Sequence, residues 1–205
     1  ELALEAAKRL VQLFQEQYGE QHSNLTLPSI YLGMAHLGTD SPRRAQDTFE
    51  HVVEIIETNK GVYETTLIPP LQGLALSFLA QDDYIEAVDA LRRANHITRR
   101  HGGVYNQAQL SIVDKLIDVE NTMGEADDIN ALQLLYLRIN EDIYGVDTPE
   151  LIPALLRLAE HKVTLGTRIP AENWEVAVYR PNIHHSWDQT KRAALFKDAQ
   201  TYYER

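Results

Sequence analysis

The chain has 205 residues, of which 44% are hydrophobic and 24% charged, and its formal charge is −11. This length suits one domain or a short array, and the composition is that of a globular protein. No apolar run reaches the roughly 20 residues that a membrane helix needs, and the negative charge disfavours general polyanion binding. The absence of cysteine excludes disulfides, thiol nucleophiles and Cys-ligated metal centres. Because the first residue is Glu1, we expect the native N-terminus to be missing.

Four glycines mark a period along the chain. Gly19, Gly61, Gly103 and Gly145 follow one another at intervals of 42 residues. Three further columns keep this interval: a leucine column, a mostly small column and a mostly alanine column (Leu32, Leu74, Leu116, Leu158; Gly33, Ala75, Ile117, Ala159; Ala3, Ala45, Ala87, Ile129). Repeats of this length stack into arrays, because one unit cannot bury its apolar face alone.

The spacing of apolar residues predicts two helices in each unit. Residues 1–18 fall in register as the second helix of a preceding unit, and three units follow at 19–60, 61–102 and 103–144. The first unit has helical patterns over 25–37 and 45–56, and the second over 67–80 and 84–97. Prolines lie near the starts of first helices, and the periodic glycines are expected in left-handed C-caps after second helices. No alternating strand pattern occurs, so the predicted fold is all-α.

The second unit resembles the tetratricopeptide repeat (TPR). It reads Leu71-x2-Leu74-Ala75-x2-Phe78, then Tyr84-x2-Ala87-x3-Leu91-x2-Ala94, close to the family pattern of large, small and aromatic positions. The period is longer than the family's usual 34 or so and is similar to the long repeats of kinesin light chains. It also falls in the HEAT and armadillo range of about 40–47, which leaves a HEAT-like array as the alternative. The resemblance implies a right-handed α-α superhelix, or solenoid, of about four helical hairpins.

The fourth unit, 145–205, departs from the register. Its second helix is identified by Phe196-x2-Ala199-x3-Tyr203, but the alanine was due at 171 and comes 28 residues late. We therefore expect an insertion at about 167–193, and an array that is cut at both ends. The insertion contains three candidate contact residues (Trp174, Arg180, Trp187). A flap over the end of the array, a partner contact and disorder are all compatible with it.

The resemblance implies that first helices line a concave binding face. The corresponding positions are apolar in the first two units and charged in the last two (Ile30, Tyr31, Met34, Gln72, Leu76, Asp114, Lys115, Asp118, Leu156, Arg157, Glu160). An extended peptide with an apolar end and a charged end would suit this face. The alternative is that these residues pack on neighbouring units or form surface ion pairs. Only Lys115 and Arg157 could approximate the carboxylate clamp of heat-shock-protein-binding arrays.

Other chemical signals are weak. The basic run of residues 92–101 is explained by the dipole at a helix C-terminus, and the net charge argues against a nucleic-acid partner. The eight histidines are scattered, and no phosphate loop, nucleophile elbow, dinucleotide fingerprint or zinc-protease helix occurs. We therefore expect no enzyme activity, cofactor or metal, and a soluble protein of the cytoplasm or of a bacterial periplasm.

The sequence thus predicts a non-enzymatic scaffold that binds a protein or peptide on the concave face of a TPR-like superhelix. The alternative is a structural or oligomerisation module, a homo-oligomer that pairs through its terminal helices or the 167–193 insertion. The identity of the partner is not readable from the residues, because one repeat fold serves many roles.

Overall fold

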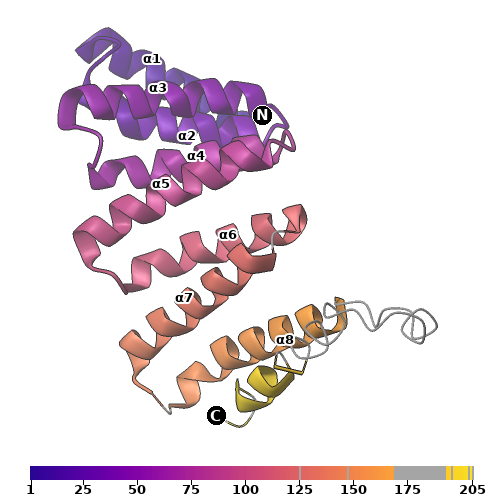
Figure 1. Ribbon diagram of the computed structural model, residues 1–205. Coiled ribbons are helices and arrows are strands. Elements are labelled where there is room, and N and C mark those ends of the chain that lie inside the picture. The colour runs from indigo at the N-terminus through magenta and orange to yellow at the C-terminus, as the bar shows by residue number, and fades with distance from the viewer. Residues whose placement is uncertain (125, 147, 169–192, 195, 203, 205) are drawn as a thin grey trace. The chain divides into compact units, whose positions relative to one another are not determined.

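The computed structural model describes residues 1–124, 126–146, 148–168, 193–194, 196–202 and 204, and their regular structure is entirely helical (Figure 1). The all-α prediction is therefore confirmed. These residues form two compact units, Glu1–Met123 and Gly124–Arg205. Most of the predicted insertion, including Trp174, Arg180 and Trp187, lies outside the described residues.

The first unit is built from helical hairpins that follow the 42-residue interval. It contains α1 (Leu2–Tyr18), α2 (Thr26–Leu37), α3 (Pro42–Lys60), α4 (Ile68–Leu79), α5 (Tyr84–Gly102) and α6 (Leu110–Met123). The second helices α3 and α5 are each 19 residues long and begin 42 residues apart. Within this unit, each helix from α1 to α5 packs on the next in sequence, and α2 also packs on α4 (Figure 1).

A short 3₁₀ turn precedes each first helix, which the sequence pattern did not reveal. The turns η1 (Ser23–Leu25), η2 (Thr65–Leu67), η3 (Gln107–Gln109) and η4 (Pro149–Leu151) begin 42 residues apart. Each turn buries the side chain of its last residue, for example Leu25 in η1 and Leu67 in η2. The turns therefore anchor the loop that enters each first helix.

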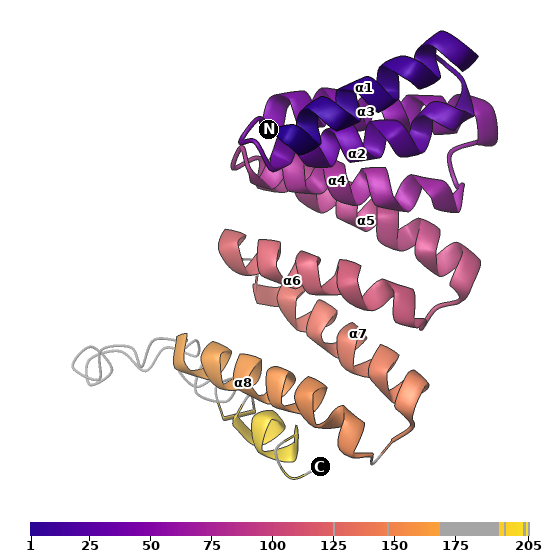
Figure 2. The same cartoon turned by 180° about the vertical axis from the view of Figure 1, so that it is seen from behind.

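The second unit contains α7 (Ala126–Tyr144), η4 and α8 (Ile152–Arg168), with further helical residues at 196–202. Tyr202 packs against the buried cluster of this unit, and Lys162 of α8 pairs with Asp198 at 3.4 Å. Ala199 is 2% exposed, so it takes the buried place that the repeat reserves for a small residue. Figure 2 shows this short helix, in yellow, beside α8.

The periodic glycines do not adopt the predicted left-handed helical cap. Gly61 has φ 97° and ψ 165°, and Gly103 has φ 90° and ψ 174°. These values describe an extended conformation at positive φ, which is almost confined to glycine. The glycines are extended because the chain leaves each second helix on a straight path toward the next 3₁₀ turn, whereas a left-handed cap would curl the chain over the helix end.

Gly33 and Gly73 leave room for one aromatic side chain. The Phe49 ring of α3 is fully buried, and a Cβ built on Gly33 would lie 2.6 Å from its Cζ. Gly73 of α4 faces the same ring even more closely. Phe49 therefore fills the space between α2 and α4 that the two glycines leave free.

Candidate functional site

The predicted groove residues of the first unit lie on three successive first helices. On α2, Tyr31 is 54% and Met34 is 47% exposed, and Ile30 is half-buried. On α4, Gln72 and Leu76 are half-buried. On α6, Asp114 and Lys115 are half-buried and Asp118 is exposed. These side chains occupy equivalent places in the repeat, and at least part of each is accessible to a ligand.

The 42-residue interval relates Tyr31, Gly73, Lys115 and Arg157, and two of these positions lie against a neighbouring second helix. Gly73 occupies this column on α4 and faces the Phe49 ring of α3. In the second unit, the Arg157 guanidinium lies 4.9 Å from the centre of the Tyr136 ring of α7. The column that contains Tyr31, Lys115 and Arg157 is thus partly engaged in packing within the array.

Tyr31 lies between two hollows of the surface formed by α1 and α2. One hollow of about 770 Å³ is bordered by Ala3, Ala7 and Met34. The other, of about 520 Å³, is bordered by Phe14, Ile30 and residues of the η1 and η2 segments. The interval of 42 residues relates Ala7 to Phe49 and Tyr31 to Gly73. On α1 and α2 the small residue (Ala7) is on the second helix and the large one (Tyr31) is on the first helix. On α3 and α4 the large residue (Phe49) is on the second helix and the small one (Gly73) is on the first helix.

The remaining predicted groove residues belong to the second unit. Leu156 is 42% exposed, Glu160 is exposed and Arg157 is half-buried. All three lie on α8. They form a local surface that combines an apolar side chain with both signs of charge.

The basic run on α5 divides into paired and exposed arginines. Arg92 contacts the carboxylate of Glu120 on α6 at 3.0 Å, and Glu120 is almost fully buried. Arg93 pairs with Glu57 of α3. Arg99 and Arg100, about two turns further on, are exposed. The first pair of arginines therefore joins helices through ion pairs, although the Arg92 side chain remains 55% exposed.

A repeated side-chain contact holds the loops that follow second helices, and the sequence analysis missed it. The Asn59 amide donates to the carbonyl of Gln21 at 3.1 Å. In the next unit His101 Nε2 lies 2.7 Å from the carbonyl of Tyr63. Both partners are shifted by 42 residues. The signal was the column Asn59–His101, whose members are different residue types that can each donate this bond.

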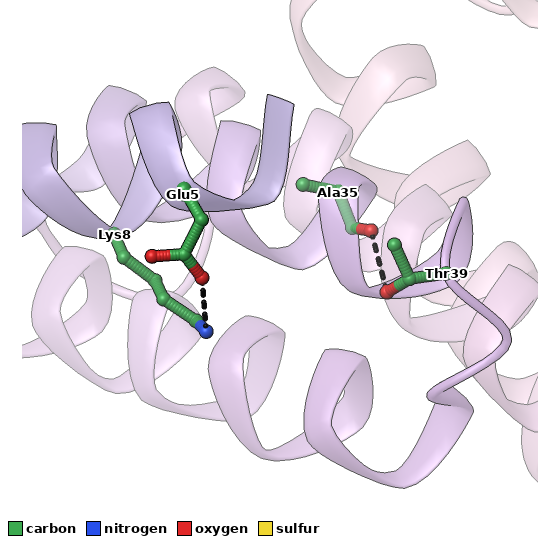
Figure 3. A network of polar contacts seen from close by, with 4 residues as sticks. All are labelled: Glu5, Lys8, Ala35 and Thr39. Carbon is green, nitrogen blue, oxygen red and sulfur yellow. Dashed lines mark hydrogen bonds and ion pairs between the residues drawn. The ribbon is translucent and has the colours of Figure 1, made fainter. Parts of the chain in front are cut away.

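His36 is a buried ionisable residue near the end of α2. It is 6% exposed, and its Nδ1 has no hydrogen-bond partner among the described residues. Burial, with smaller contributions from the charges of Arg44 and Lys8, lowers the pKa of His36. Figure 3 shows Lys8 held by Glu5 at 2.9 Å, and the Thr39 hydroxyl donating to the Ala35 carbonyl at 3.1 Å. Burial of His36 thus favours its neutral form.

In the described part of the chain, His, Asp and Glu side chains form no group of three that could hold a metal ion. Among the described helices, none combines the length and the apolar character that crossing a bilayer requires.

The comparisons with known proteins identify the fold. No protein-family model matches the sequence. No curated protein matches it either. Among solved structures, the chain is similar to the TPR-like repeats assigned to a kinesin light chain of Podosopora anserina, with a TM-score of 0.68 and 14% identity over 98% of this chain and 85% of that chain.

Two further structures agree. A single-substitution variant of the same repeats has a TM-score of 0.69 and 15% identity, over 97% of this chain and 87% of that chain. BtubC (BKLC) from P. vanneervenii has a TM-score of 0.58 and 15% identity, over 98% of this chain and 87% of that chain. The chain therefore has the fold of a TPR-like repeat protein, an α-solenoid, and the predicted resemblance is confirmed.

Proposed function

We propose that this chain is a non-enzymatic scaffold that binds a protein or peptide segment on the face formed by its first helices. A protein-interaction role is typical of the TPR-like fold, because stacked repeats present a long continuous surface. The observation that carries the proposal is the equivalent placement of accessible side chains on α2, α4 and α6. We restrict the proposed face to two columns whose described side chains are all half-buried or exposed: Ile30–Gln72–Asp114 and Met34–Leu76–Asp118.

The two columns change character along the first unit. Ile30 and Met34 on α2 and Leu76 on α4 offer apolar surface, whereas Asp114 and Asp118 on α6 offer carboxylates. A matching ligand is an extended segment with apolar side chains at one end and Lys or Arg at the other. Apolar contact supplies affinity and the charges fix the direction in which the segment lies.

Selection from a displayed library of random peptides tests the proposal. We expect enriched peptides to combine apolar residues with Lys or Arg, and we expect Met34→Glu to weaken their binding about tenfold, as for a residue central to an interface. The double change Asp114→Lys with Asp118→Lys should shift the selection toward acidic peptides.

Matched controls use exposed residues of second helices. Ile85 is 65% exposed on α5, so Ile85→Glu adds the same charge away from the proposed face. Asp47→Lys with Asp89→Lys repeats the charge reversal on α3 and α5. Absence of any enriched peptide, or equal losses in the test and control variants, would contradict the proposal.

A second candidate function, self-association through a terminal helix, has one observation in its favour. On α1, Leu13 is 45% exposed and Leu2 is 90% exposed. Ile55, the counterpart of Leu13 one unit later, is fully buried. Light scattering distinguishes the two functions: a stable dimer that Leu13→Glu converts to monomers supports self-association, and a monomer that binds peptides supports the scaffold.

A further inference from the structure

Exposed basic side chains gather at the C-terminal end of α5, and three of them, His96, Arg100 and His101, contact Tyr63 of the loop after α3. We call this group the Tyr63 cluster, after the residue at its centre; its members are Val62, Tyr63, His96, Arg99, Arg100 and His101. The guanidinium of Arg100 lies 4.6 Å from the centre of the Tyr63 ring, and the His96 ring centre lies 5.9 Å from it. His101 fixes the Tyr63 carbonyl at 2.7 Å. The ring is therefore held in place while 48% of the residue remains exposed.

The repeat itself does not require cations at these positions. At the equivalent places on α3 stand Glu54, Glu57, Thr58 and Asn59, and on α7 Arg138, Glu141, Asp142 and Ile143. Helices α3 and α5 have the same length and the same exit into an extended glycine. The dipole of a helix favours cations such as Arg99 and Arg100 at its C-terminus. It does not explain why α5 differs from α3 and α7, because α3 forms with Glu, Thr and Asn at the same positions. Of the members on α5, His101 alone keeps the structural role of its counterpart, through the bond to the loop carbonyl.

The cluster combines the features of a contact that binds carboxylates. Arginine presents a planar fork that matches a carboxylate through paired hydrogen bonds. Tyrosine and arginine are the residue types that contribute most at protein interfaces, and a ring that is already fixed loses little entropy on binding. Val62, which is 49% exposed, adds apolar surface beside the ring.

We propose that the Tyr63 cluster binds a short acidic peptide segment of a partner protein, in which carboxylates flank an apolar side chain. The carboxylates contact Arg99 and Arg100, and the apolar side chain packs on Tyr63 and Val62. The net charge of −11 favours a short segment over a nucleic acid, because a long polyphosphate would meet the negative field of the rest of the chain. This site is separate from the first-helix face of the proposed function, so either can fail without the other.

The probe is a short fluorescein-labelled peptide in which glutamates flank a central leucine, and binding is followed by fluorescence anisotropy. We expect Arg99→Glu with Arg100→Glu to weaken binding by about tenfold or more, as expected for charge reversal at a complementary contact. The matched control is Arg43→Glu with Arg44→Glu, an exposed pair at the start of α3 with the same change in net charge. That control should stay within about twofold of the unchanged protein, because distant exposed charges are screened by salt.

A second pair of variants tests the ring. Tyr63→Ala should weaken binding several-fold, whereas Tyr105→Ala, the same position one unit later and 40% exposed, should not. Circular dichroism confirms that each variant keeps its helical content. Equal losses in the two arginine pairs, no measurable binding of the peptide, or tighter binding and displacement by a labelled oligouridine would each overturn the proposal.

Discussion

Phe49 is the residue on which the packing of the first unit centres. Its ring is fully buried and touches the positions of Gly33 on α2 and Gly73 on α4. One unit later Leu91 stands in its place. A single aromatic side chain thus determines which neighbouring positions must lack a Cβ.

Substitution of Gly73 by alanine should therefore destabilise the protein. The new methyl group has no space beside the Phe49 ring, and overpacking of this kind costs about 1–3 kcal/mol of unfolding free energy. The double variant Gly73→Ala with Phe49→Leu should cost less than the sum of the single changes, which urea unfolding can measure. Additive costs would show that the ring and the glycine are not coupled.

His36 makes the stability of the first unit sensitive to acid. Its pKa is lowered in the folded chain, mainly by burial, so the unfolded chain binds the proton more readily. The contribution of His36 is complete above the unfolded pKa, about 6.5, and is lost as the pH falls. Phe78 occupies the equivalent place on α4, so His36→Phe is a substitution that the repeat already accommodates.

We expect His36→Phe to lose less thermal stability than the unchanged protein when the pH is lowered from about 7.5 to 5, a window that spans the usual histidine pKa. His36→Gln should behave in the same way, because it also lacks the titrating group. Identical pH profiles of all three proteins would show that His36 does not titrate between the folded and unfolded states.

At the scale of elements, two loops between hairpins are each held by a side chain at the end of the following second helix, α3 or α5. Asn59 holds the carbonyl of Gln21, and His101 holds that of Tyr63. The glycine that begins each loop has positive φ, and no described heavy atom lies within 4 Å of the place a Cβ would take at Gly61. The cost of any side chain at Gly61 is therefore one of backbone conformation and not of space.

His101→Asn should retain the loop bond, because Asn59 makes it one unit earlier. His101→Leu should remove it and lower the unfolding free energy by about 0.5–1.5 kcal/mol, the usual net contribution of a hydrogen bond. Chemical denaturation of the two variants measures the difference. If the asparagine variant loses as much as the leucine variant, the bond does not stabilise the loop.

At the scale of the whole molecule, the described residues form two compact units, one before and one after residue 123. In repeat arrays each hairpin contacts its neighbours, and stability is nearly a sum of local terms. A destabilising substitution in one unit is therefore expected to leave the stability of distant helices unchanged.

Phe49→Ala tests this locality. The loss of a buried phenylalanine costs about 3–5 kcal/mol where it acts, so amide hydrogen exchange in α2, α3 and α4 should accelerate. Exchange in α8, which belongs to the other unit, should be unchanged. Acceleration throughout the chain would indicate one cooperative fold in place of local terms.

The all-α class, the 42-residue period and the TPR-like hairpin were readable from the residues alone, because a repeat must place small and apolar side chains at the same points of every unit. The same logic located the short helix around Ala199, whereas α3 begins at Pro42, before the predicted helical pattern of residues 45–56. These features depend on the periodic spacing of small and apolar residues, which can be read directly from the sequence.

The direction of individual side chains was decided by the tertiary structure. Tyr31 and Met34 border the same surface hollow, whereas the Arg157 guanidinium lies over the Tyr136 ring of α7, a contact that the 42-residue interval did not reveal. The extended glycine conformation, the 3₁₀ turns and the Tyr63 cluster likewise depend on contacts between residues far apart in the chain. Periodicity specifies which positions are buried, whereas the neighbouring helix determines what each exposed position meets.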